Sequence, residues 1–116
     1  MFSTMEAVRL LLSLKSPITR QIIIFDWDDT LFPTEYFKTR IEMLQNHALI
    51  PPEINLNLRT IASNIIKVIT NAKLCGNVSI ISNATIVWLQ LCIDVIPEII
   101  PLLQTININN KGMQDH

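Results

Sequence analysis

The sequence predicts an α/β fold built on a parallel sheet, and three observations lead to this prediction. Short runs of β-branched and aromatic residues alternate with longer segments whose apolar side chains recur every three or four positions. The first short run is apolar at every position, which is typical of a strand covered on both faces. Strands that alternate with helices indicate right-handed crossovers between parallel neighbours. We therefore expect a three-layer, Rossmann-like domain with about three strands.

Composition limits the chain to one domain and excludes several classes of protein. The 116 residues carry 9 Lys or Arg and 10 Asp or Glu, so there is no excess of basic residues to build a nucleic-acid-binding surface. Only 16% of the residues are charged and 49% are hydrophobic, which excludes a charge-rich disordered chain. The most apolar stretch, residues 84–103, contains Asp94, Pro97, Glu98 and Pro101, and we therefore expect no membrane span.

The amino-terminal segment and the two cysteines indicate a cytoplasmic protein. Residues 1–15 have no basic region ahead of their leucine run and no small-residue cleavage site, so we do not expect them to form a signal peptide. Cys75 and Cys92 lack the spacing of a metal site and are interpreted as reduced thiols.

The predicted elements divide into an amino-terminal helix at 1–16, a core domain at 17–108 and a polar tail at 109–116. Ser3 or Thr4 can cap the first helix, whose apolar stripe contains Val8, Leu11 and Leu12. In the core we expect a strand at 22–25, helices at 34–48 and 54–74, a strand at 78–81, helices at 85–95 and 99–103, and a strand at 105–108. Gly76 stands where a glycine commonly ends a helix.

Three carboxylates, Asp26, Asp28 and Asp29, directly follow the first predicted strand. Crowded carboxylates repel one another, and a divalent cation with oxygen ligands relieves the repulsion. A carboxylate can also attack phosphorus, while a second acid protonates the leaving oxygen and later deprotonates water. Ser82 follows the second strand, and the carboxyl ends of parallel strands carry the chemistry of such sheets. The alternative is a solvated acidic turn that caps the next helix.

The segment Ile-Ile-Ile-Phe-Asp-Trp-Asp-Asp-Thr-Leu at 22–31 resembles the first motif of the haloacid dehalogenase superfamily, a strand followed by D-x-D-x-T-L. The resemblance implies that Asp26 is a nucleophile that becomes phosphorylated and that Asp28 is the general acid and base. It also implies that Mg²⁺ binds Asp26 and the backbone carbonyl of Asp28, and that Thr30 helps to hold the loop. An acid at the second position is the phosphatase type of this motif.

The strand that ends at Ser82 is similar to the second motif of the same superfamily. By this resemblance Ser82 and the backbone N–H of Asn83 bind the phosphoryl oxygens of a phosphorylated small molecule or protein. The similarity extends over about residues 21–104 and is nearest to uncharacterised members from protists and fungi.

Two parts of the superfamily's site have no counterpart in the sequence. The family uses a Lys or Arg near the phosphoryl group and an acidic pair after a fourth strand. After Ser82 the only Lys or Arg is Lys111, in the polar tail, and neither Asp94, Glu98 nor Asp115 follows an apolar strand. We therefore expect an incomplete, carboxyl-terminally truncated core with weak or no phosphatase activity. A non-catalytic binding or regulatory module, or a gene fragment, is the alternative.

The missing strand has a consequence for the predicted first strand. In the superfamily that strand is central, so without its fourth-motif neighbour the segment 22–25 has an unpaired apolar edge. Such an edge favours self-association or the addition of a partner strand.

Overall fold

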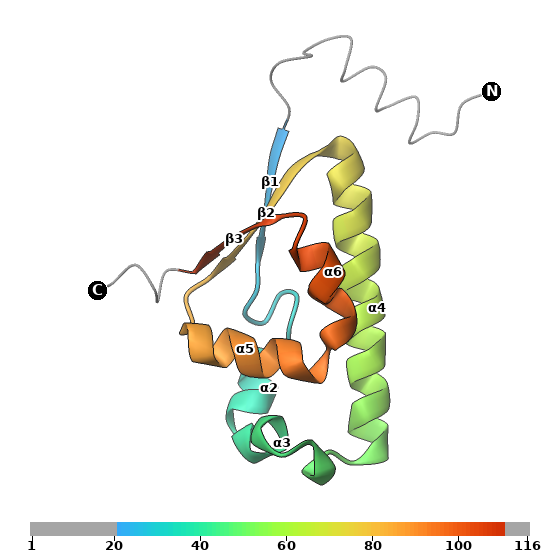
Figure 1. Ribbon diagram of the computed structural model, residues 1–116, viewed down its shortest axis with the longest axis vertical. Coiled ribbons are helices and arrows are strands. Elements are labelled where there is room, and N and C mark those ends of the chain that lie inside the picture. Colours follow the sequence, from blue (N-terminus) through green and yellow to red (C-terminus); the bar gives the residue numbers. More distant parts are fainter. Residues whose placement is uncertain (1–20, 111–116) are drawn as a thin grey trace, which may run out of the picture.

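The computed structural model describes residues 21–110 and has an α/β fold with a three-stranded, all-parallel sheet. The strands lie in the order β1-β2-β3, and helices alternate with them along the chain (Figure 1). The predicted α/β class with a parallel, Rossmann-like sheet of three strands is thereby confirmed. The predicted helix at 1–16 and the tail from residue 111 lie outside the described residues.

The elements have the following bounds. The strands are β1 (Gln21–Asp26), β2 (Gly76–Ser82) and β3 (Asn107–Asn110). The helices are α2 (Thr34–Lys38), α3 (Ile41–Gln45), α4 (Pro52–Cys75), α5 (Ile86–Val95) and α6 (Ile100–Leu103), with short 3₁₀ turns η1 (His47–Leu49) and η2 (Pro97–Ile99).

Two predicted boundaries are wrong. The single helix expected at 34–48 is divided into α2, α3 and η1, because the backbone leaves the helical region at Arg40, where φ is −132° and ψ is 39°. The Arg40 guanidinium instead donates to the Tyr36 carbonyl oxygen at 2.9 Å and lies over the Tyr36 ring. At the other end, β3 begins and ends two residues later than predicted, so Asn109 and Asn110 belong to the sheet rather than to a tail.

The long helix α4 is confirmed and joins the first two strands. Pro52 occupies its first turn, where the missing N–H of proline costs no helical hydrogen bond. Its buried positions recur every three or four residues, as the sequence pattern predicts, and are Leu58, Ala62, Ile65 and Ile69. In Figure 1 α4 runs back along the length of the sheet, and it contacts β2.

Gly76 has a different role from the one predicted. Its φ of −177° is extended, so it begins β2 directly rather than ending α4 in a left-handed conformation. A Cβ atom at this position would lie 2.3 Å from the backbone oxygen of Gln21. Glycine is therefore required because β1 passes too close for any side chain.

Helices cover one face of the sheet among the described residues. Val78 and Ile80 of β2 are 6% and 1% exposed and pack into the core formed by α4 and α5. On the opposite face Ile22 is 71% exposed and Ile24 is 58% exposed, so the expected two-sided burial of the first strand is not found within residues 21–110. The physical reason is the consecutive strand order, because two right-handed crossovers between successive neighbours place both connections on the same face.

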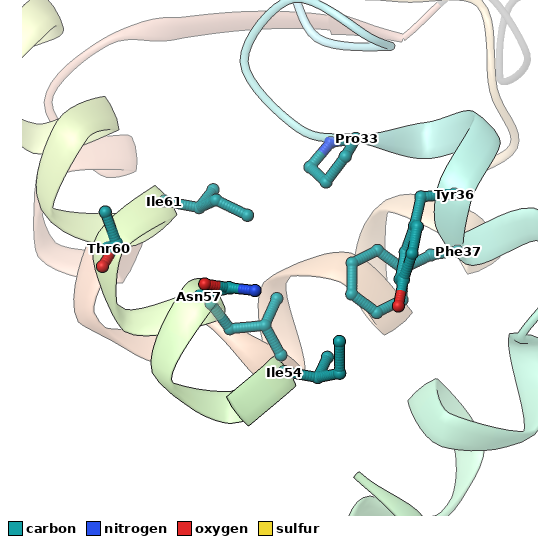
Figure 2. A pocket seen from close by; sticks show the side chains of 8 residues that line it. Pro33, Tyr36, Phe37, Ile54, Asn57, Thr60 and Ile61 are labelled. Atoms are coloured by element: carbon teal, nitrogen blue, oxygen red, sulfur yellow. The ribbon is translucent and has the colours of Figure 1, made fainter. Parts of the chain in front are cut away.

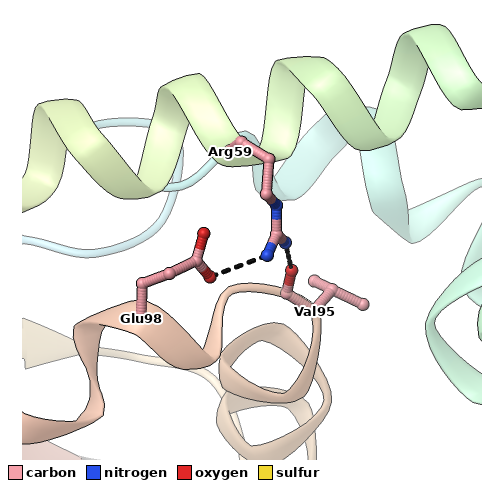
Figure 3. A network of polar contacts seen from close by, with 3 residues as sticks. All are labelled: Arg59, Val95 and Glu98. Carbon is pink, nitrogen blue, oxygen red and sulfur yellow. Dashed lines mark hydrogen bonds and ion pairs between the residues drawn. The ribbon is translucent and has the colours of Figure 1, made fainter.

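Arg59 joins α4 to the carboxyl end of α5. Its guanidinium donates to the carbonyl oxygen of Val95 and forms an ion pair of 2.8 Å with Glu98 (Figure 3). Among residues 21–110 no single helix is long and apolar enough to cross a membrane; α5 together with the segment Pro97–Leu103 passes that test only as a pair bent by 102°.

Candidate functional site

The carboxyl ends of β1 and β2 meet at the same edge of the sheet, as the sequence predicts. Asp26 pairs in parallel register with Ile81, and the Trp27 N–H continues the pairing to the Ile81 carbonyl oxygen at 2.9 Å. The loop that follows β1 is therefore held directly beside Ser82, the last residue of β2.

Asp28 is the residue that links these two strand ends. Its Oδ2 accepts a hydrogen bond of 2.9 Å from the Ser82 hydroxyl, and its Oδ1 accepts one of 2.9 Å from the Thr34 hydroxyl. Ser82 is 0% exposed and Thr34 is 3% exposed, so both donors are fixed by packing. The Ala84 N–H in turn donates to the Ser82 oxygen at 3.2 Å. The carboxylate is thus oriented from two different elements.

The site contains a residue that the sequence analysis did not identify, namely Thr34. It is the first residue of α2 and lies six positions after the acid that it contacts. Its signal in the sequence is only a hydroxyl at a predicted helix start, which ordinarily indicates a cap. In the structure the Thr34 hydroxyl donates to Asp28 instead of capping a helix. The capping position before α2 is Pro33, and it forms no side-chain cap hydrogen bond.

Asp29 turns the chain between Asp28 and α2. It adopts a left-handed conformation with φ of 59°, which Asp tolerates better than most residues. Its N–H donates to the Phe32 carbonyl oxygen at 2.8 Å, and its Oδ1 accepts from the Glu35 N–H at 2.9 Å. This carboxylate therefore satisfies a free N–H in the first turn of α2.

An aromatic cluster of Trp27, Phe32 and Phe37 packs between the loop after β1 and the hydrophobic core. The Trp27 and Phe32 rings stack at 5.5 Å with 4° between their planes, and Phe37 packs against Phe32 at 5.4 Å. All three side chains are at most 2% exposed. The loop that carries Asp28 is consequently anchored in the core rather than projecting into solvent.

Cys92 of α5 lies beneath the same loop. Burial raises the pKa of its thiol from 9.0 to about 12, and the negative charge of Asp28 adds to this rise. Since the side chain is 0% exposed, Cys92 behaves as a neutral packing residue under the acidic loop.

Asp26, Thr30 and Asn83 are exposed around this centre. Asp26 ends β1 on the same face as Ile24, because side chains alternate along a strand. Thr30 lies in the loop, and its hydroxyl forms no hydrogen bond with residues 21–110. The threonine that holds the loop is instead Thr34, through its hydrogen bond to Asp28. Asn83 directly follows Ser82 at the end of β2.

The oxygen atoms available for Mg²⁺ are those of Asp26 and Asp28. The Asp26 carboxylate is exposed, and the Asp28 carbonyl oxygen accepts no backbone hydrogen bond from residues 21–110. Mg²⁺ commonly uses one or two carboxylates and completes its six ligands with water and phosphate oxygens, so these residues fit the ion as a partial set. Within the described part of the chain, no three His, Cys, Asp or Glu side chains gather as they do in an all-protein metal site.

A separate apolar cavity of about 400 Å³ lies between α2 and α4 (Figure 2). Pro33, Tyr36 and Phe37 line one side of it, and Ile54 and Ile61 line the other. It borders the acidic loop through Pro33, but no acidic or basic side chain lines it. This cavity therefore adds no catalytic group to the site.

Comparison with protein-family models, with curated proteins and with solved structures gave no match.

Proposed function

We propose that this chain is a Mg²⁺-dependent phosphohydrolase of the haloacid dehalogenase type, with Asp26 as the nucleophile. The observation that supports the proposal is the hydrogen bond between Asp28 and Ser82, since it joins the two predicted motifs at one edge of the sheet. The proposal also rests on the resemblance of residues 22–31 to the first motif of that superfamily. Its substrate is a phosphorylated small molecule or protein, and its location is the cytoplasm.

The proposed reaction has two balanced steps. In the first, a carboxylate oxygen of Asp26 bonds to phosphorus, the bond from phosphorus to the leaving oxygen breaks, and Asp28, which enters the cycle protonated, gives that oxygen its proton. In the second, Asp28 takes a proton from water, the water oxygen bonds to phosphorus, and inorganic phosphate leaves as the Asp26 carboxylate is restored. Asp26 and the Asp28 carbonyl oxygen would hold Mg²⁺, which when bound would neutralise negative charge at the phosphoryl oxygens.

The fixed orientation of Asp28 suits its proposed role as general acid and base. Ser82 and Thr34 hold its two oxygens, so the side chain does not need to be ordered when substrate arrives. Because Ser82 is 0% exposed and donates to Asp28, its proposed contact with a phosphoryl oxygen requires both an opening of the strand end and a turn of the hydroxyl hydrogen to the substrate. The Asn83 N–H stands next to it at the exposed strand end.

A non-catalytic binding or regulatory module is the second candidate, and one observation favours it. Neither Asp26 nor Asp28 forms an ion pair with a Lys or Arg of residues 21–110; the ion pair described there is Arg59–Glu98. A positive group near the phosphoryl oxygens stabilises the charge that develops in the transition state, and loss of one such donor costs about 10²–10³ in rate.

The test is hydrolysis of an aryl phosphate by the 116-residue chain in Mg²⁺, beside Asp26→Asn and an EDTA control. Asp94→Asn is the matched control, because Asp94 is an exposed acid on α5 that accepts from Gln90, and an amide oxygen keeps that bond. We expect weak Mg²⁺-dependent turnover that falls at least about 100-fold in Asp26→Asn and is unchanged in Asp94→Asn. Turnover that survives Asp26→Asn would refute the assigned nucleophile. A folded chain without turnover would support the second candidate.

A further inference from the structure

The face of the sheet away from the helices carries an apolar patch, which we call the open face and define by Ile22, Ile24 and Ile81. Ile22 is 71% exposed, Ile24 is 58% exposed and Ile81 is half-buried. The three residues share one face because Ile24 pairs with Ser79, and Ile81 lies two positions beyond Ser79. The neighbouring positions on this face of β2, Asn77 and Ser79, are polar. The patch is therefore narrow and is concentrated on β1.

We propose that residues 3–14 of this chain form an amphipathic helix that packs on the open face and covers Ile22 and Ile24. The sequence of this segment carries a stripe that matches a narrow apolar patch. At 100° per residue, Val8, Leu11 and Leu14 fall on one side, with Leu11 at its centre. Glu6, Arg9 and Ser13 fall together on the opposite side. The inference is independent of the proposed phosphatase activity.

The length of the chain ahead of β1 suits this placement. A helix over residues 3–14 is about 18 Å long, and the six residues of β1 span about 20 Å. Residues 15–20 connect the two and reach at most about 20 Å, enough for the helix to turn back along the strand that follows it. Because the connection is short, the segment meets the open face at an effective concentration near the millimolar range.

Burial provides the driving force for the contact. Covering the exposed area of two isoleucines contributes on the scale of about 25 cal/mol per Å² of apolar surface, and the facing Val8 and Leu11 contribute in the same way. A second copy of the chain would have to supply an equivalent surface without the short connection. The tethered segment is therefore the favoured occupant.

Disulfide trapping in the full chain tests the proposal. In a Cys75→Ser background, Ile24→Cys is combined with Val8→Cys or Leu11→Cys on the predicted stripe. Glu6→Cys and Ser13→Cys on the opposite side serve as matched controls. Cys92 is retained because it is 0% exposed. Mild oxidation is followed by intact mass and non-reducing electrophoresis, which separate bonds within a chain from bonds between chains.

We expect an intrachain disulfide in at least one stripe variant, formed at least tenfold faster than in both controls. Equal rates for stripe and control positions, or no intrachain bond, would overturn the proposal. Predominant interchain dimers would overturn it as well and would indicate a second copy on the open face. If Ile24→Cys does not fold by circular dichroism, Ile22→Cys replaces it, since this side chain is still more exposed.

Discussion

At the scale of single residues, the Asp28 carboxylate is the most constrained polar group at the strand ends. Each of its oxygens accepts from a buried hydroxyl, one on β2 and one on α2. Both donors were placed there by packing of their own elements, so the carboxylate connects parts of the fold that are 54 positions apart in the chain. Loss of either donor leaves an acceptor that water reaches poorly.

We predict that Ser82→Ala lowers the free energy of unfolding by about 1–3 kcal/mol, because it removes the hydroxyl that donates to Asp28 Oδ2. Urea denaturation measures the change. Ser79→Ala on the same strand is the matched control, since Ser79 faces away from the loop and forms no side-chain hydrogen bond with residues 21–110. A loss of equal size in both variants would show that the Asp28 contact adds nothing.

The Cys92 thiol predicts a stability that depends on alkaline pH. Burial raises its pKa from 9.0 to about 12, so between these values the unfolded chain loses a proton that the folded chain keeps. Stability from this group is complete below pH 9 and falls as pH rises toward 12, by about 1.4 kcal/mol per unit at most. We expect urea denaturation at pH 8 and pH 10.5 to show a smaller loss in Cys92→Ala than in the unaltered chain. Parallel losses would contradict the buried thiol.

At the scale of elements, the close approach of β1 to the start of β2 sets the geometry of the sheet. Gly76 pairs with Gln21, and its Cα passes so near the Gln21 carbonyl that a methyl group would overlap it. The strand pair and the end of α4 are therefore fixed at one position. Backbone atoms form this contact, so neither partner can move aside as a side chain would.

We predict that Gly76→Ala destabilises the fold by about 1–3 kcal/mol or more, because the added Cβ would lie 2.3 Å from the Gln21 oxygen. Thermal unfolding followed by circular dichroism measures the effect. Asn77→Ala, at the next and exposed position of β2, is expected to change the midpoint little. An unchanged midpoint in Gly76→Ala would mean that β1 and β2 can move apart at this end with no loss of stability.

The Arg59 contact gives a prediction about how α4 is joined to α5. The ion pair with Glu98 is more than one-third exposed on both sides, so Glu98→Gln is expected to cost less than about 1 kcal/mol. Arg59→Met is expected to cost more, about 1–2 kcal/mol, because it also leaves the carbonyl of the buried Val95 without its donor. Urea denaturation of both variants compares them. A larger loss in Glu98→Gln would assign the stability to the ion pair instead.

At the scale of the whole molecule, long periodic segments were predictable and local breaks were not. The stripe of α4 repeats over 24 residues, so the sequence pattern identifies it without knowledge of its partners. At the break the Arg40 side chain turns back to the Tyr36 carbonyl, a local contact that the spacing of apolar residues does not record. The apolar run of β1 predicts burial on both faces, but an unbroken run cannot say which element supplies the second cover.

The candidate site was predictable in part for the same reason. Asp28 and Ser82 each follow an apolar strand, and parallel pairing brings strand ends together, so their contact follows from the order of the elements. Thr34 depends on the left-handed turn at Asp29, which directs α2 back toward the strand ends. A turn of this kind is set by local hydrogen bonds that the residue types alone do not specify.

The parallel pairing of β1 with β2 also has a consequence for synthesis of the chain. Ile23 pairs with Val78, which is made 55 residues later. At about 5–20 residues per second, the ribosome needs roughly 3–11 seconds to add the partner of β1. During that interval the Ile-Ile-Ile-Phe segment has been synthesised, but the strand that pairs with it has not. Among the segments described here, β1 is therefore where a nascent-chain chaperone is expected to bind.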